Sequence, residues 1–143
     1  MKKIIITAAL FSMTFVSIAK NNFFANPKES SGQLVLVSNK VTQSLFSVTL
    51  LSINGIEVSH NDSSVWLKPG TYDLSFSTAI DHKYAGGNGI NSRRSNTRHD
   101  ELNRNLNITV EANKVYHIAY NAKDENNKNW SPVIWKEKLR KGN

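Results

Sequence analysis

Most of the chain alternates between apolar and polar side chains with a period of two, which predicts β-strands. In residues 71–77 the large side chains Tyr72, Leu74 and Phe76 alternate with small polar ones, and residues 106–110 repeat the pattern. No stretch carries the spacing of an amphipathic helix. About eight strands are expected, over residues 34–37, 45–53, 56–60, 65–68, 71–77, 106–110, 115–122 and 130–138. Short strands at such intervals are typical of an all-β sandwich or barrel.

Turn residues stand between the predicted strands. Asn54-Gly55 indicates a tight hairpin, because both positions of that turn need a positive φ, which these residues tolerate. Pro69-Gly70 joins a residue with a fixed φ to one with a free φ, and predicts another turn. Asn113-Lys114 predicts a turn before the next strand. These turns favour an antiparallel arrangement, and we expect a single antiparallel β-sandwich.

The first 19 residues have the three parts of a bacterial export signal. Lys2 and Lys3 are basic, residues 4–16 are apolar, and Ser17-Ile18-Ala19 has the small-x-small pattern of a cleavage site. The apolar run is shorter than the roughly 20 residues that a membrane-spanning helix needs. We therefore expect a signal peptide over 1–19 that is cleaved after Ala19, a periplasmic or secreted product, and no membrane span after cleavage.

The remaining chain is long enough for one domain. We expect a flexible lead-in over residues 20–32, rich in polar side chains, and the β-sandwich over 33–138. Within that domain, residues 79–103 form a long polar loop, and residues 139–143 form a basic tail. Connections this long are usually functional or disordered.

Composition excludes several kinds of chemistry. The chain of 143 residues has no cysteine, so it has no disulfide, thiolate metal site or cysteine nucleophile. Its net charge is +7, and because two of the 18 basic residues lie in the leader, the cleaved chain would carry +5. This charge favours solubility and weak attraction to polyanions. We expect no nucleic-acid partner, since an exported protein rarely meets nucleic acid.

The long polar loop is the first candidate site. It has a glycine-rich neck at residues 86–89, without the Lys-Ser/Thr of a phosphate-binding loop. Four arginines lie towards its end: Arg93, Arg94, Arg98 and Arg104. Arginine forks bind phosphate and carboxylate groups in bidentate geometry. A solvated connection between two strands is the alternative interpretation.

The aromatic residues offer a second candidate surface. They are Trp66, Trp130, Trp135, Tyr72, Tyr116 and Tyr120. Such side chains can stack against sugars and peptides, but core packing is the expected role on alternating strands, and Trp135 and Tyr72 fit it well. Trp130 stands between polar neighbours at a strand entry, so we expect it to be exposed and able to bind a ligand.

Catalytic patterns are weak. The consecutive side chains of residues 99–101 (His-Asp-Glu) rarely converge on one point, and His117 on an alternating strand is expected to be a partly buried structural histidine. No Gly-x-Ser-x-Gly elbow is present, and no spacing is typical of a calcium loop or a paired-carboxylate site. We expect no enzymatic activity, no metal and no cofactor.

Residues 50–58 and 65–76 together resemble the PEGA-type domain and related small bacterial envelope proteins of unknown function. The shared pattern is an apolar strand, an Asn-Gly turn, a short strand, then Leu-Lys-Pro-Gly-Thr-Tyr and an alternating strand. Residues 110–118 are similar to the second half of those proteins, although Asn113 stands where they usually have glycine. The resemblance implies an immunoglobulin- or transthyretin-like sandwich in the cell envelope and carries over no catalytic residues.

Three functional hypotheses follow. The first is a non-enzymatic binding or accessory module of the envelope, whose partner is an unknown envelope protein or a cell-wall polymer. The second is a polyanion or cell-wall glycan binder that uses the arginine-rich loop. The third is a small secreted hydrolase. The oligomeric state stays open, because the edge strands of a sandwich could pair two copies.

Overall fold

The computed structural model describes residues 22–38, 40–58, 62–78 and 102–142. This part of the chain is built mostly of β-strands and contains no α-helix, which confirms the all-β prediction. The strands are β1 (Gly32–Val35), β2 (Leu45–Phe46), β3 (Val48–Ile53), β4 (Ile56–Glu57), β5 (Ser64–Leu67), β6 (Gly70–Thr78), β7 (Asn105–Val110), β8 (Lys114–Asn121) and β9 (Ser131–Leu139). Two short 3-10 helices are η1 (Val41–Gln43) and η3 (Asn127–Asn129).

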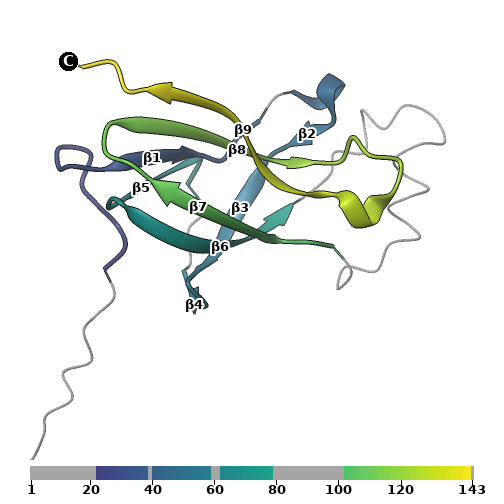
Figure 1. The fold of residues 1–143 in the computed structure, drawn as a ribbon, viewed down its shortest axis with the longest axis horizontal. Coiled ribbons are helices and arrows are strands. Elements are labelled where there is room, and N and C mark those ends of the chain that lie inside the picture. The colour runs from purple at the N-terminus through teal and green to yellow at the C-terminus, as the bar shows by residue number, and fades with distance from the viewer. Residues whose placement is uncertain (1–21, 39, 59–61, 79–101, 143) are drawn as a thin grey trace, which may run out of the picture.

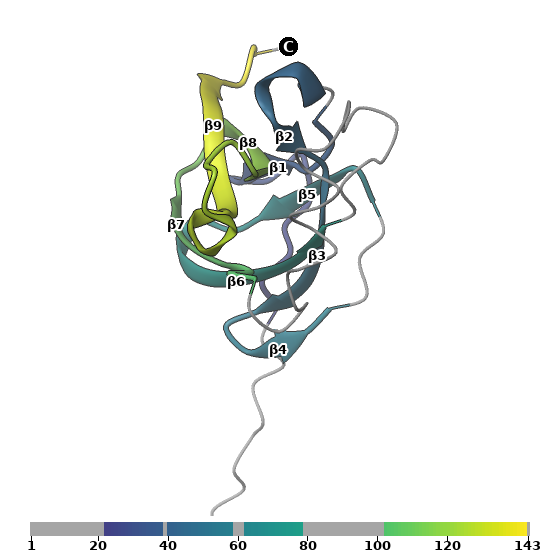
Figure 2. The ribbon, with the colours of Figure 1, turned by 90° about the vertical axis from the view of Figure 1, so that its right-hand side faces the viewer.

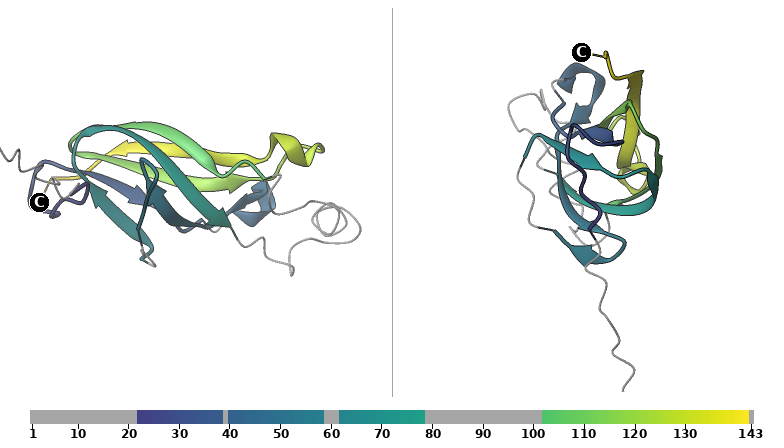
Figure 3. Two further views of the ribbon diagram at one scale, coloured as in Figure 1. Left: turned by 90° about the horizontal axis from the view of Figure 1, so that it is seen from below. Right: turned by 90° about the vertical axis from the view of Figure 1, so that its left-hand side faces the viewer.

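The strands form two sheets that lie one above the other (Figures 1 and 2). In the first sheet, β8 pairs with β9 along its whole length. Its other edge pairs first with β1 and further along with β2, and β5 pairs with the other edge of β1. The second sheet has the order β4-β3-β6-β7. All these pairs are antiparallel except β1 with β8, which is parallel. The long strands β8 and β9 run side by side in the view from below (Figure 3).

One hydrophobic core fills the space between the sheets. Alternation places Leu34 of β1 and Ile118 of β8 on the inner side of the first sheet, where both are fully buried. Leu74 and Phe76 of β6 face them from the second sheet. Burial of one side chain of this size contributes about 1.5–3 kcal/mol to the free energy of folding. Burial between the sheets therefore stabilises a fold that has no disulfide.

The predicted strand over 45–53 is divided in two, which gives nine strands instead of eight in the described residues. The division falls at Ser47, because the chain leaves the first sheet after Phe46 and enters the second at Val48. Ser47 Oγ accepts a hydrogen bond from the Ser38 backbone N–H at 2.9 Å and donates one to the Ser38 carbonyl at 3.2 Å. This side chain satisfies backbone groups at the crossing between the sheets.

Two predicted turns are confirmed. Asn54 and Gly55 have φ values of 50° and 78° and join β3 to β4. The Asn54 side-chain oxygen also accepts a hydrogen bond from the Asp73 backbone N–H at 2.9 Å, which ties the turn to β6. Asn113 has a φ of 62° and lies between β7 and β8. Asparagine tolerates this left-handed conformation better than most residues.

Residues 22–32, which belong to the lead-in that was expected to be flexible, contact the first sheet. Phe24 forms a β-bridge with Leu67, and the Ala25 N–H donates to the Trp66 carbonyl at 3.0 Å, so this segment covers the outer edge of β5. Ser31 is fully buried. The predicted signal peptide and residues 79–101 of the polar loop lie outside the described residues. Within the described part, no helix combines the length and apolar character needed to cross a membrane.

Candidate binding face

The sequence-predicted site is only partly described. Arg93, Arg94 and Arg98 lie outside the described residues. Arg104 is half-buried just before β7, and its carbonyl accepts a hydrogen bond from the Phe76 N–H at 2.9 Å. The described residues thus give no joint surface for the four arginines.

The prediction of an exposed Trp130 is wrong. Its side chain is 1% exposed and belongs to the core. The indole Nε1–H donates to the Asp124 carbonyl at 2.8 Å, and the Trp130 carbonyl accepts from the Tyr120 hydroxyl at 3.5 Å. Burial raises the pKa of Tyr120 to about 12. Its polar neighbours Asn129 and Ser131 are the last residue of η3 and the first of β9, so their polarity did not indicate exposure of Trp130 itself.

A different surface, the outer side of the first sheet, brings aromatic and basic side chains together. Gln33 of β1 lies beside Trp66 of β5 on one side and Val115 of β8 on the other, and Val115 lies beside Lys138 of β9. One step along the sheet, a parallel row contains Val35, His117 and Lys136. We call this surface the basic face; it comprises Gln33, Val35, Trp66, His117, Trp135, Lys136 and Lys138.

A β-bulge adds Trp135 to the basic face. The register of β8 and β9 shifts between His117 and Ile118, and Trp135 is the extra residue on β9. Its indole lies against the His117 imidazole, with 5.4 Å between ring centroids and an angle of 59° between the rings. A bulge re-aims a side chain in this way because it puts two residues of one strand opposite one of the other.

The charges on the basic face have one sign. Burial lowers the pKa of His117, and the nearby charges of Lys138 and Lys136 lower it further. Glu137, between these lysines in sequence, alternates to the other side of β9, where its carboxylate lies 2.8 Å from Lys114 Nζ. Hydrogen bonds to Glu111 and Glu137 raise the pKa of Lys114. None of the residues that make up the basic face is acidic.

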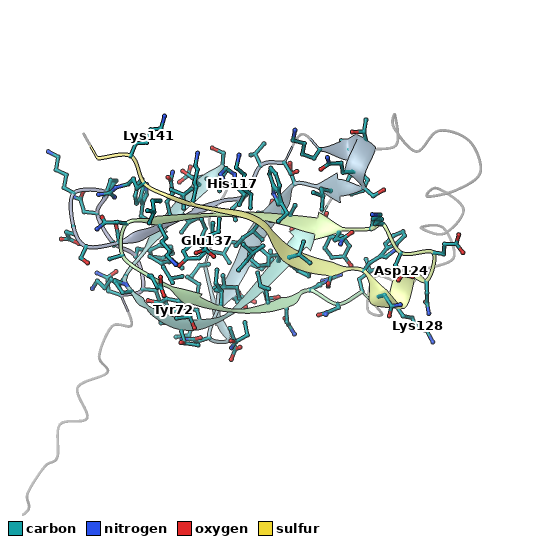
Figure 4. All side chains as sticks on the ribbon, turned by 45° about the horizontal axis from the view of Figure 1, so that its top comes forward. Tyr72, His117, Asp124, Lys128, Glu137 and Lys141 are labelled. Carbon is teal, nitrogen blue, oxygen red and sulfur yellow. The ribbon has the colours of Figure 1, made fainter. Side chains whose placement is uncertain are left out.

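A groove lies at the end of the basic face where β9 ends. The Arg140 guanidinium is 5.3 Å from the centroid of the Trp66 ring, and its Nη1 donates to the Pro27 carbonyl at 3.1 Å. The groove has a volume of about 710 Å³. Its lining residues are Pro27, Gln33, Trp66, Asn113, Leu139, Arg140, Lys141 and Gly142. Figure 4 shows Lys141 at this end of the molecule, and Asp124 and Lys128 at the opposite end.

The outer side of the second sheet has a contrasting chemistry. Thr71 and Thr109 form a hydroxyl–hydroxyl hydrogen bond of 3.1 Å across β6 and β7. Asn107 donates to the Asp73 carboxylate at 2.6 Å beside it. These polar groups hydrogen-bond to each other, whereas the basic face carries cationic groups beside partly exposed aromatic side chains.

Trp66 was among the aromatic candidates for stacking, and its outward direction follows from the buried Val65 and Leu67 on either side of it. Trp135 was expected to pack in the core, but it lies beside His117 at the bulge and is not part of the core cluster. The expected basic tail included Arg140, but β9 extends to Leu139 and the Arg140 N–H donates to the Asn113 carbonyl at 2.7 Å. Nothing local indicated that Arg140 would reach Trp66.

Searches with protein-family models, among curated proteins and among solved structures give no match for this chain. In the described ranges, no group of three His, Asp or Glu residues is placed to hold a metal ion.

Proposed function

We propose that this protein is an exported, non-enzymatic β-sandwich of the bacterial cell envelope that binds an anionic cell-wall glycan through the basic face. The observation that carries the proposal is that Lys136 and Lys138 of β9 lie on the same side of the first sheet as His117, Trp135 and Trp66, with no carboxylate among the residues of the face. The export signal and the turn pattern shared with PEGA-type envelope proteins support the location.

The chemistry of the face suits an acidic sugar polymer. Lysine ammonium groups attract carboxylate and phosphate groups, and a low-dielectric sheet surface beneath them strengthens the local potential. Tryptophan presents a large, rigid and partly apolar surface that costs little conformational entropy on binding. A neutral polymer would leave the lysine charges uncompensated, so the face favours an anionic ligand.

The arginine-rich loop can take part in the same binding. Arg93, Arg94 and Arg98 lie between β6 and β7, and they would add positive charge to an already basic protein. A role in binding an envelope protein remains the competing hypothesis, because loops on a rigid scaffold commonly carry partner contacts.

Binding to cell-wall material tests the proposal. The full coding sequence is expressed in a bacterial host, and mass spectrometry defines the purified species, including cleavage after Ala19. The protein is then sedimented with insoluble cell walls, before and after chemical removal of their anionic polymers, over a range of salt concentrations. We expect binding that needs the anionic polymers and weakens as salt rises.

Two double variants locate the binding surface. Lys136→Gln with Lys138→Gln removes two charges from the basic face; Lys123→Gln with Lys128→Gln removes two exposed charges elsewhere. A lysine at an anionic surface contributes about 1 kcal/mol, so we expect roughly thirtyfold weaker binding for the first variant only. Equal losses in both variants, or binding that salt and polymer removal leave unchanged, would overturn the proposal.

A further inference from the structure

Arg140 is held in place from three directions. Its guanidinium carbon lies over the Trp66 ring, 5.3 Å from the ring centroid, and Nη1 donates to the Pro27 carbonyl at 3.1 Å. Its backbone N–H donates to the Asn113 carbonyl at 2.7 Å, which extends the β8–β9 pairing by one residue. A long side chain usually loses rotamer freedom when it binds a ligand. Here the contacts with Trp66, Pro27 and Asn113 already restrict the rotamers of Arg140 before a ligand binds.

In the described residues, most N–H donors of the Arg140 guanidinium have no hydrogen-bond acceptor. A guanidinium carries five N–H donors in one plane and no acceptor. Within the described residues the Pro27 carbonyl takes one of them, and the guanidinium carbon lies over the Trp66 ring, so the other donors have no hydrogen-bond partner there. Carboxylate and phosphate oxygens bind such an edge in bidentate geometry. The arrangement is therefore suited to an oxyanion that lies in the plane of the guanidinium.

The groove around Arg140 has the size and lining for a sugar that carries such a group. Its volume of about 710 Å³ falls within the range of small-molecule sites. The amide groups of Gln33 and Asn113 line it and can hydrogen-bond hydroxyls, and Lys141 adds a second positive charge. Leu139, which is 72% exposed, and Trp66 supply apolar surface.

We infer that Trp66 and Arg140 form a subsite for one acidic sugar residue, in which Arg140 binds the carboxylate or phosphate group. This inference rests on the proposed function, because it names the part of the glycan that the basic face recognises. The lysines of β9 supply long-range attraction, whereas the groove supplies selectivity for an oxyanion at a fixed position.

Small probes test the subsite directly. The full chain is titrated with glucuronic acid, with glucose 1-phosphate and with glucose, and the indole N–H signal of Trp66 is followed by NMR. Trp66→Phe identifies that signal. We expect a saturable shift with at least one of the two acidic probes and no shift with glucose. The stronger acidic probe shows whether the natural group is a carboxylate or a phosphate, and an equal shift with glucose would overturn the inference.

Arg140→Lys tests whether binding needs the guanidinium group itself or only its positive charge. The variant keeps the positive charge but loses the planar donors and the stacking, so we expect at least tenfold weaker binding of the acidic probe. Lys128→Gln at the opposite end is the control and should bind as the unaltered chain does. Arg140 lies beyond the last strand residue, and the melting temperature checks that the variant folds. Unchanged binding by Arg140→Lys would overturn the inference.

The outcomes for the two proposals are distinguishable. Cell-wall binding that depends on Lys136 and Lys138, without any probe response at Trp66, would reject the subsite and keep the basic face. Probe binding that depends on Arg140, in a protein that does not bind cell walls, would keep the subsite and reject the proposed polymer.

Discussion

The imidazole of His117 packs against the indole of Trp135, with ring centroids 5.4 Å apart, and two of their nitrogens are buried without a hydrogen-bond partner. These are His117 Nε2 and Trp135 Nε1, and the statement holds for the described residues. An unpaired buried polar group costs about 1–3 kcal/mol, and a buried charge costs more. A positive charge on His117 would add to this cost at the contact with Trp135.

Protonation of His117 should weaken the fold. Burial, with Lys138 and Lys136 nearby, lowers the pKa of His117 below its ordinary value of 6.5. Below pH 6.5 the unfolded chain takes up a proton that the folded chain resists, so the free energy of unfolding falls as the pH falls. Above pH 6.5 this contribution is fully present. Urea midpoints measured from pH 8 to pH 5 would show the decline.

The matched variant is His117→Phe, which keeps an aromatic ring against Trp135 and has nothing to titrate. We expect its urea midpoint to change less than that of the unaltered chain between about pH 7 and pH 5.5. If the variant loses stability as steeply as the unaltered chain, another group causes the pH dependence.

Gly32→Ala should destabilise the fold. A Cβ at this position would clash with Val110 Cγ1 and come within 2.8 Å of the Glu111 carbonyl oxygen. Overpacking in a well-packed region costs typically about 1–3 kcal/mol, which denaturant unfolding would detect. Gly142→Ala is the control, because nothing lies within 4 Å of a Cβ there. Equal stability of the two variants would mean that the contact between β1 and the end of β7 is looser than described.

Trp130→Ala should lower the free energy of unfolding by about 3–5 kcal/mol, because it removes a buried aromatic side chain from the core. Trp130→Phe keeps most of the packing but leaves the Asp124 carbonyl without the indole donor, at a cost of about 1–2 kcal/mol. Equilibrium unfolding measures both. Acidic-probe binding to folded Trp130→Phe should match that of the unaltered chain; specific loss of binding would return Trp130 to the list of ligand contacts.

Ser47→Ala should lower the free energy of unfolding by about 1–3 kcal/mol, because it leaves the Ser38 N–H without its acceptor where the chain crosses between the sheets. Ser30→Ala, at an exposed position, should unfold at the same denaturant concentration as the unaltered chain. Hydrogen exchange at the Ser38 amide would show the local effect. An amide that exchanges equally slowly in Ser47→Ala would contradict the role assigned to the serine side chain.

Sequence patterns predicted the elements whose causes are local. Alternation indicated which side chains of β6 face the core, because successive residues of a strand point to opposite sides. Asn54-Gly55 and Asn113 indicated turns, because few other residues adopt a positive φ at low cost.

Only the tertiary structure decided features that depend on residues distant in sequence. The crossing at Ser47, the parallel pairing of β1 with β8 and the burial of Trp130 each need partners that alternation does not name. The groove is the clearest case, since Arg140 reaches Trp66 and Pro27 across the ends of other strands. The period of the pattern and the turn residues act over a few positions, so they determined the strands. The sheet order placed Lys136 and Lys138 on the same side of the sheet as the tryptophans and brought Arg140 over Trp66.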